Sequence, residues 1–144
     1  MTHEDAGKYG AKHPAGAVVD PSIAATLERR AEDGRVTCVA AHEVAGTLGV
    51  APAEVGKAID LREYRIIECQ LGLFGYEPRK KVVQPAETLS DPVREQLDRL
   101  AKGGEISCAS AWGIADGLGL PRMSVASACE LLGIKIRRCQ LGAF

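Results

Sequence analysis

Four cysteines recur in two pairs with the same spacing, which makes them the first residues to consider for chemistry. Cys38 and Cys69 are 31 residues apart, and Cys108 and Cys139 repeat that separation. If the segments of a pair met as antiparallel strands, each pair would form a dithiol site, and a symmetric association would gather four thiolates. Thiolates are ligands for zinc and for iron–sulfur clusters. The spacing therefore leaves a metal or redox site open at these cysteines.

Two observations favour core packing over metal binding at these positions. The sequence contains no Cys-x-x-Cys pair, from which zinc sites usually draw ligands. His42 follows Cys38 by four residues, which would place both on one helix face, but its counterpart in the second half is Trp112. Five cysteines without an evident export signal also favour reduced thiols. We therefore expect no cofactor, with zinc or an iron–sulfur cluster at the four repeated cysteines as the alternative.

The cysteine spacing is one sign of an internal duplication. Shifting the sequence by 70 positions aligns 34–74 with 104–144 without a gap, and 15 of the 41 aligned pairs are identical. The longest identical block, Cys-Gln-Leu-Gly-x-Phe, begins at Cys69 and at Cys139. It predicts a glycine turn after a strand, with the alternative of an interface role for Gln70, Phe74, Gln140 and Phe144. The chain is thus predicted to consist of two similar units.

Each unit is predicted to fold as helix, strand, helix, turn, helix and strand. Apolar residues recur at helical spacing in six segments: 20–31, 40–48, 52–61, 91–101, 110–118 and 121–132. Short segments with apolar and β-branched residues predict strands at 35–38, 64–68, 105–108 and 134–138. The expected fold class is therefore mainly α with short β strands, an α+β fold.

These boundaries divide the chain into four segments. A flexible N-terminal arm is expected at 1–19, the first repeat at 20–75, a basic linker at 76–89 and the second repeat at 90–144. Units of about 70 residues bury little apolar surface alone. We therefore expect the two halves to pack together or the chain to form a homodimer.

The centre of each repeat carries a recognisable pattern. It reads Val44-Ala45-x-x-Leu48-Gly49-Val50 followed by Val55 and Ala58, and Ile114-Ala115-x-x-Leu118-Gly119-Leu120 followed by Val125 and Ala128. A small alanine lets two helices cross closely, and glycine accommodates a left-handed turn residue. The pattern resembles the helix-turn-helix consensus of bacterial regulators. The flanking strands make it similar to the winged helix superfamily, which implies tandem winged-helix-like repeats.

The resemblance implies binding to DNA, because the second helix of such a pair enters the major groove in DNA-reading members. The residues it assigns to this contact are Lys57 and Arg62 in the first copy and Arg122, Ser124 and Ser127 in the second. The linker residues Arg79, Lys80 and Lys81 would bind phosphate. The first interpretation is therefore a transcriptional regulator whose two units mimic a regulator dimer.

Charge and motifs leave a second interpretation open. The formal net charge is −1, which is not a strong nucleic-acid footprint. The alternative is a non-catalytic protein-interaction subunit, with or without a cysteine metal or redox site. Catalytic motifs are not found in the sequence, so no enzymatic activity is expected. No segment is apolar enough to predict a signal core or a membrane span, which favours the cytoplasm.

Overall fold

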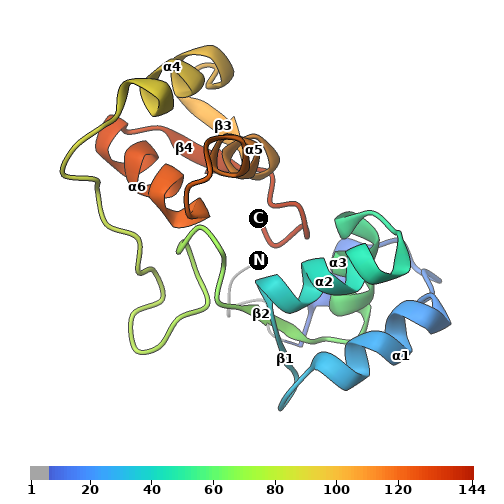
Figure 1. Cartoon of the computed structure of the whole chain (residues 1–144). Coiled ribbons are helices and arrows are strands. Elements are labelled where there is room, and N and C mark those ends of the chain that lie inside the picture. The colour runs from blue at the N-terminus through green and yellow to red at the C-terminus, as the bar shows by residue number, and fades with distance from the viewer. Residues whose placement is uncertain (1–6) are drawn as a thin grey trace. The chain divides into compact units, whose positions relative to one another are not determined.

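The computed structural model describes residues 7–144, which form an α+β fold of helices and short strands (Figure 1). The first six residues of the expected arm lie outside this range. By its internal contacts the chain divides into two compact units. Unit 1 consists of the chain up to Cys69 together with the C-terminal segment Gln140–Phe144. Unit 2 consists of the intervening residues, Gln70–Cys139. The division differs from the boundaries expected near 75 and 90, because each repeat's last residues belong to the other repeat's unit.

Unit 1 contains the elements predicted for the first repeat and one more. Its elements are η2 (Tyr9–Lys12), α1 (Pro21–Arg30), β1 (Arg35–Thr37), α2 (Cys38–Leu48), α3 (Pro52–Leu61) and β2 (Arg65–Ile67). The short 3₁₀ helix η2 lies in the segment expected to be a flexible arm, and Tyr9 within it is buried. The described part of the arm is therefore packed against unit 1 at this point.

Unit 2 repeats the same order without a counterpart of η2 among its described elements. Its elements are α4 (Asp91–Leu100), β3 (Glu105–Ser107), α5 (Cys108–Leu118), α6 (Arg122–Leu132) and β4 (Lys135–Arg137). All six predicted helices and four predicted strands are confirmed, with bounds that differ by at most two residues. Residues 76–89, the expected linker, contain no helix or strand.

Local side chains explain where the helices begin and end. The Asp20 carboxylate accepts a hydrogen bond from the backbone of Ser22 at 2.8 Å, which caps α1. The Thr37 hydroxyl caps α2 by accepting from the backbone of Ala40 at 3.1 Å. This cap lets α2 begin directly after its strand, two residues before the predicted start. Gly49 and Gly119 end α2 and α5 at φ of 65° and 67°, a conformation that glycine adopts without strain.

The strands of each unit pair in parallel. Val36 lies opposite Ile66 in the β1–β2 pair, and Ile106 lies opposite Ile136 in the β3–β4 pair. Two helices connect the strands of a pair, so the chain returns to the starting edge before the second strand begins. The antiparallel arrangement considered for the cysteine pairs is therefore not formed.

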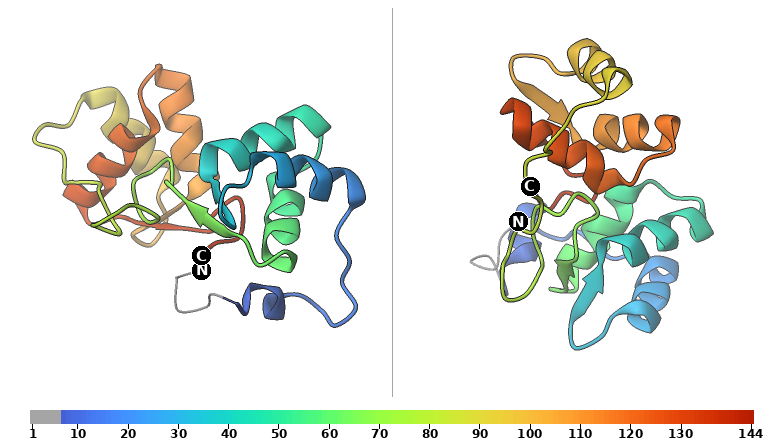
Figure 2. Two further views of the ribbon diagram at one scale, coloured as in Figure 1. Left: turned by 90° about the horizontal axis from the view of Figure 1, so that it is seen from below. Right: turned by 60° about the vertical axis from the view of Figure 1, so that its left-hand side comes forward.

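The core of each unit lies between its helices and its small sheet. In unit 1 it includes Leu27, Val36 and Ile59, and in unit 2 Leu97, Ile106 and Val125, all buried. Both tails of the repeated Cys-Gln-Leu-Gly block contribute a fully buried leucine, Leu71 to unit 2 and Leu141 to unit 1. The C-terminal segment, red in Figure 2, accordingly runs beside elements of unit 1. Each core is thus completed by residues of the other repeat.

Candidate functional site

The outward face of α3 carries little positive charge. Ala53 and Glu54 are exposed and Lys57 is half-buried, at positions that share one side of the helix. The remaining sides are covered, since Val55, Gly56, Ala58, Ile59 and Asp60 are all buried. Lys57 is therefore the only basic residue on the free face of this helix, and Glu54 lies three residues before it. Arg62, predicted to contact DNA, is exposed just after the helix ends.

The corresponding face of α6 is neutral. Ser124 and Leu131 are exposed, and Met123 and Ser127 are half-buried on the same side. The predicted DNA contacts Ser124 and Ser127 are therefore placed outward, but no basic residue accompanies them on this face. Leu131 is 44% exposed, and Leu118 and Leu120 on either side of the turn before α6 are each 37% exposed. The outward face of α6 and the turn before it thus present apolar side chains rather than cations.

Arg122, the basic residue predicted to begin the reading helix, is held by two side chains of α5. Its Cζ lies 3.6 Å from the centre of the Trp112 ring. Its Nε and Nη2 donate to the two carboxylate oxygens of Asp116, each at 3.2 Å. A guanidinium that stacks on an aromatic ring and donates two hydrogen bonds to a carboxylate stabilises the local packing of these side chains. Its position favours a role in joining α5 to α6.

Replacing Arg122 with alanine should shift the fluorescence emission of Trp112 to longer wavelength. Trp112 is the single tryptophan of the chain and is only 9% exposed, and loss of the guanidinium opens its ring to water. The free energy of unfolding should fall by about 1 kcal/mol, the usual scale for a cation–π contact with a partly exposed ion pair. Arg137→Ala, which removes the exposed Arg137–Glu105 pair of unit 2, is the control and should leave the emission unchanged.

A groove runs beside the last helix of each unit, α3 in unit 1 and α6 in unit 2. In unit 1 the segment Val18–Pro21 faces Glu54 and Lys57 across a space of about 370 Å³. In unit 2 the segment Ala86–Ser90 faces Ser124 and Ser127 across a space of about 420 Å³. Serines in unit 2 thus replace the glutamate and lysine of unit 1. The two grooves are equivalent in position but differ in chemistry.

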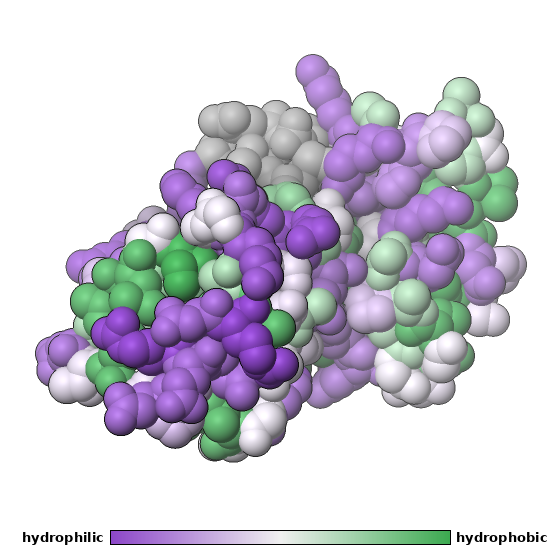
Figure 3. Space-filling view, turned by 90° about the horizontal axis from the view of Figure 1, so that it is seen from above, coloured by the Kyte–Doolittle hydropathy of each residue, from purple (hydrophilic) through white to green (hydrophobic). Residues whose placement is uncertain are grey.

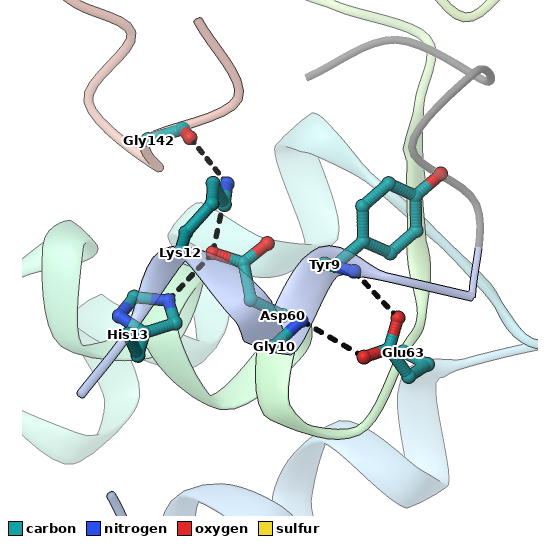
Figure 4. Close-up of polar contacts among 7 residues, drawn as sticks. All are labelled: Tyr9, Gly10, Lys12, His13, Asp60, Glu63 and Gly142. Carbon is teal, nitrogen blue, oxygen red and sulfur yellow. Dashed lines mark hydrogen bonds and ion pairs between the residues drawn. The ribbon is translucent and has the colours of Figure 1, made fainter. Parts of the chain in front are cut away.

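The end of α3 anchors the N-terminal arm through two carboxylates (Figure 4). Glu63 accepts backbone hydrogen bonds from Tyr9 at 2.7 Å and from Gly10 at 2.8 Å. Asp60 pairs through one oxygen with Lys12 Nζ and with His13 Nε2, both at 2.9 Å. Asp60 is the one buried charged residue among those that the structure describes. This cluster joins the arm to the end of α3 through four polar contacts.

Unit 2 carries a simpler version of the same anchor. Glu130, which aligns with Asp60, pairs with Lys81 of the linker at 2.6 Å. Lys81 was predicted to bind phosphate, and this contact engages it within unit 2. The linker residues Arg79 and Lys80 are exposed. The Asp60 anchor was not predicted from the sequence. The available signal was that both repeats keep an acid at the aligned positions 60 and 130, and that a lysine lies upstream of each.

The repeated cysteines are largely buried. Cys38, Cys69 and Cys108 are buried, and Cys139 is half-buried. In unit 1 the two thiols follow the same end of the parallel strands, since Cys38 comes after Thr37 and Cys69 after Ile67. Within residues 7–144, no group of three or more His, Cys, Asp and Glu side chains is arranged to hold a metal ion. The structure therefore places these cysteines in packed surroundings.

Burial has a chemical consequence at the fifth cysteine. Desolvation, with a contribution from Glu130, raises the pKa of Cys129 from 9.0 to about 11. In the native protein at pH 8 the Cys129 thiol should therefore react with iodoacetamide at least about a hundredfold more slowly than in the unfolded chain, since the thiolate is the nucleophile. Mass spectrometry of peptides after timed labelling measures this, and half-buried Cys139 should be modified first.

The same pKa shift affects stability at high pH. The unfolded chain loses the Cys129 proton near pH 9.0, whereas the folded chain keeps it to about pH 11. This contribution to stability is thus present below pH 9 and is lost as the pH rises toward 11. Cys129→Ala should weaken that decline in urea titrations, whereas an unchanged pH profile would show that the thiol does not contribute.

The predicted interface residues belong to the two exchanged tails. Gln70, Phe74 and Gln140 are half-buried, and Phe144 is 45% exposed. In both tails the leucine between them is more deeply buried than the glutamine and phenylalanine. The leucine, rather than the predicted residues, is therefore the innermost of these residues in each tail.

Comparisons with protein-family models, curated proteins and solved structures found no match to this chain. None of the helices in residues 7–144 has the length and apolar content needed to cross a bilayer. The functional proposal therefore rests on the residues and geometry described above.

Proposed function

We propose that the chain is a non-catalytic protein-interaction subunit built from two helix-turn-helix units. The observation that carries this proposal is the character of the outward faces of α3 and α6. One presents Ala53, Glu54 and Lys57 with no net charge, and the other presents Ser124 and Leu131. Phosphate binding requires a concentration of Lys and Arg, whereas protein interfaces favour apolar groups with a polar rim.

Two features support the helix-turn-helix likeness. In each unit a left-handed glycine joins two helices, and a valine that aligns in both copies, Val55 and Val125, is fully buried between the elements. The winged-helix part of the likeness has less support. A wing is a hairpin that follows the second helix of the helix-turn-helix pair. Here a single strand follows that helix: β2 after α3, which pairs in parallel with β1, and β4 after α6, which pairs in parallel with β3.

The charged surface of unit 2 also suits a protein partner better than nucleic acid. The exposed side of α4 carries acids and bases together: Arg94, Glu95, Asp98 and Arg99. On the face shown in Figure 3, hydrophilic residues (purple) are interspersed with smaller hydrophobic groups (green). The acids and bases mixed along α4 give no continuous run of positive charge for phosphate on this helix. The exposed leucines around α6 are the apolar groups that a partner would cover.

Affinity capture with the full chain tests the proposal. A natural partner should be retained by the wild-type chain and lost with Leu131→Lys, which places a charge on the outward face of α6. Glu95→Lys, which adds a positive charge on the exposed face of α4, is the matched control and should retain the partner. Equal capture by both variants would overturn the assignment of the interface to α6.

DNA binding by a transcriptional regulator with an internal pseudo-dimer is the second candidate. The observation that favours it is the exposure of Arg62, Arg79 and Lys80, three of the predicted contacts. Fluorescence anisotropy with a labelled 30-base-pair duplex of mixed sequence, at about 20 mM and 200 mM salt, tests it. Affinity that falls steeply with salt and is reduced by Arg62→Ala would favour this candidate, and no binding at low salt would remove it.

A further inference from the structure

The C-terminal tail contacts α3 more closely than a side chain would allow. A Cβ atom at Gly56 would lie 1.9 Å from the Leu141 carbonyl oxygen and 2.7 Å from its carbonyl carbon. Real Cβ atoms do not approach other atoms to this distance. Gly56 therefore opens a slot in α3 into which the main chain of the tail fits.

The tail fills this slot with alternate residues. Leu141 and Ala143 are only 2% and 3% exposed, whereas Gly142 between them is exposed. Gly142 has a φ of +77°, which a residue with a side chain adopts only with strain. The slot thus selects for leucine, then glycine, then a small residue.

A charged group from the arm completes the slot. Lys12 Nζ donates a hydrogen bond to the Gly142 carbonyl oxygen at 2.8 Å and lies 2.9 Å from Asp60 Oδ2 (Figure 4). The buried Asp60 carboxylate holds the ammonium in place, so the contact to the carbonyl is charge-assisted. Arm and helix therefore form a prepared site, and the tail occupies it as a segment from the other repeat.

Unit 2 uses the same two residue types in its own tail contact. Leu71 is fully buried, and Gly72 follows at a φ of +74°. A Cβ at Gly72 would lie 3.1 Å from Met123 of α6 and from Val83, so both side chains would have to shift by a few tenths of an ångström to admit it. Ala126 stands where α3 has Gly56, so unit 2 has no glycine at the position of the slot. Both copies of the duplicated block thus keep a buried leucine followed by a left-handed glycine.

We propose that the α3 slot is a binding site for polypeptide segments of the type Leu-Gly-Ala that turn at the glycine, with residues 140–144 as its resident occupant. Residues 140–144 of a second copy of the chain would occupy the slot when the resident tail leaves. The proposal rests on the interaction role above and names the chemistry of one partner segment. It assigns binding to unit 1, whereas the capture experiment concerns the outward face of α6.

A peptide-exchange experiment on the full chain tests the slot. Leu141→Asp places a carboxylate in the apolar slot and should expel the resident tail. A fluorescein-labelled Gln-Leu-Gly-Ala-Phe peptide should then bind this variant at least tenfold more tightly than it binds the wild-type chain, where the tethered tail competes at high effective concentration. The milder Leu141→Ala variant should give intermediate affinity, and it serves if Leu141→Asp fails to fold.

Two controls separate slot binding from general adhesion. Adding Gly56→Ala to either Leu141 variant fills the slot and should abolish peptide binding, and a Gln-Leu-Ala-Ala-Phe peptide should bind at least tenfold more weakly. Peptide binding that survives Gly56→Ala, or no binding to a folded Leu141 variant, would overturn the proposal. Neither outcome depends on α6, so loss of the slot leaves the Leu131 capture test intact.

Discussion

Replacing Gly56 with alanine is expected to lower the free energy of unfolding by about 2–4 kcal/mol. The new Cβ would overlap the Leu141 carbonyl, which is backbone and cannot rotate away as a side chain could. The tail must therefore leave the slot, and the protein loses the burial of Leu141 and Ala143. Full burial of one leucine alone is worth about 1.5–3 kcal/mol. Urea unfolding followed by circular dichroism measures the loss.

Gly46→Ala is the matched control for this change. Gly46 also lies inside a helix, α2, but a Cβ there would meet nothing within 4 Å. Alanine should therefore stabilise the protein by about 0.5–1 kcal/mol through helix propensity. Opposite signs at the two glycines would establish that the effect at Gly56 comes from the tail. A Gly56→Ala protein as stable as the wild type would mean that the tail does not occupy the slot in solution.

The elements of the fold were accessible from sequence because their signals are local. Apolar spacing located α2 and α5, and the glycines at 49 and 119 marked their ends. Strand direction was less accessible. Strands of three residues, such as Arg35–Thr37, carry no periodic signal long enough to indicate a partner. Their parallel pairing follows from the path of the two connecting helices.

The candidate site was less accessible because its contacts join segments far apart in sequence. Lys12 and Asp60 are 48 residues apart, and Lys12 and Gly142 are 130 apart. Spacing and composition do not report such pairs. The identical tail block did point to Gln70 and Gln140, but the comparison drew attention to the polar residues. The leucine and glycine carried more information, because burial and a positive φ both restrict the residue type.

Among the substitutions proposed for unit 1, loss of the Asp60 charge that anchors the arm should have the second largest effect on the free energy of unfolding. Asp60→Asn keeps the size of the side chain but removes the charge that faces Lys12 and His13. Breaking a fully buried ion pair costs about 3–5 kcal/mol. Lys12 and His13 are 31% and 21% exposed, so they can turn toward water, and we expect a smaller cost of about 2 kcal/mol. Thermal and urea unfolding at pH 7 measure this cost.

Glu130→Gln provides the comparison within the same molecule. Glu130 aligns with Asp60, but its pair with Lys81 is more open, with side chains 29% and 50% exposed, so its loss should cost at most about 0.5 kcal/mol. If Asp60 holds the arm, Asp60→Asn should also make the chain easier to cleave by trypsin after Lys12, while Glu130→Gln leaves that site protected. Equal costs for the two substitutions would show that the burial of Asp60 adds nothing to its ion pair. Unchanged cleavage after Lys12 would show that the arm is retained by Glu63 and Tyr9 instead, since their backbone hydrogen bonds do not involve Asp60.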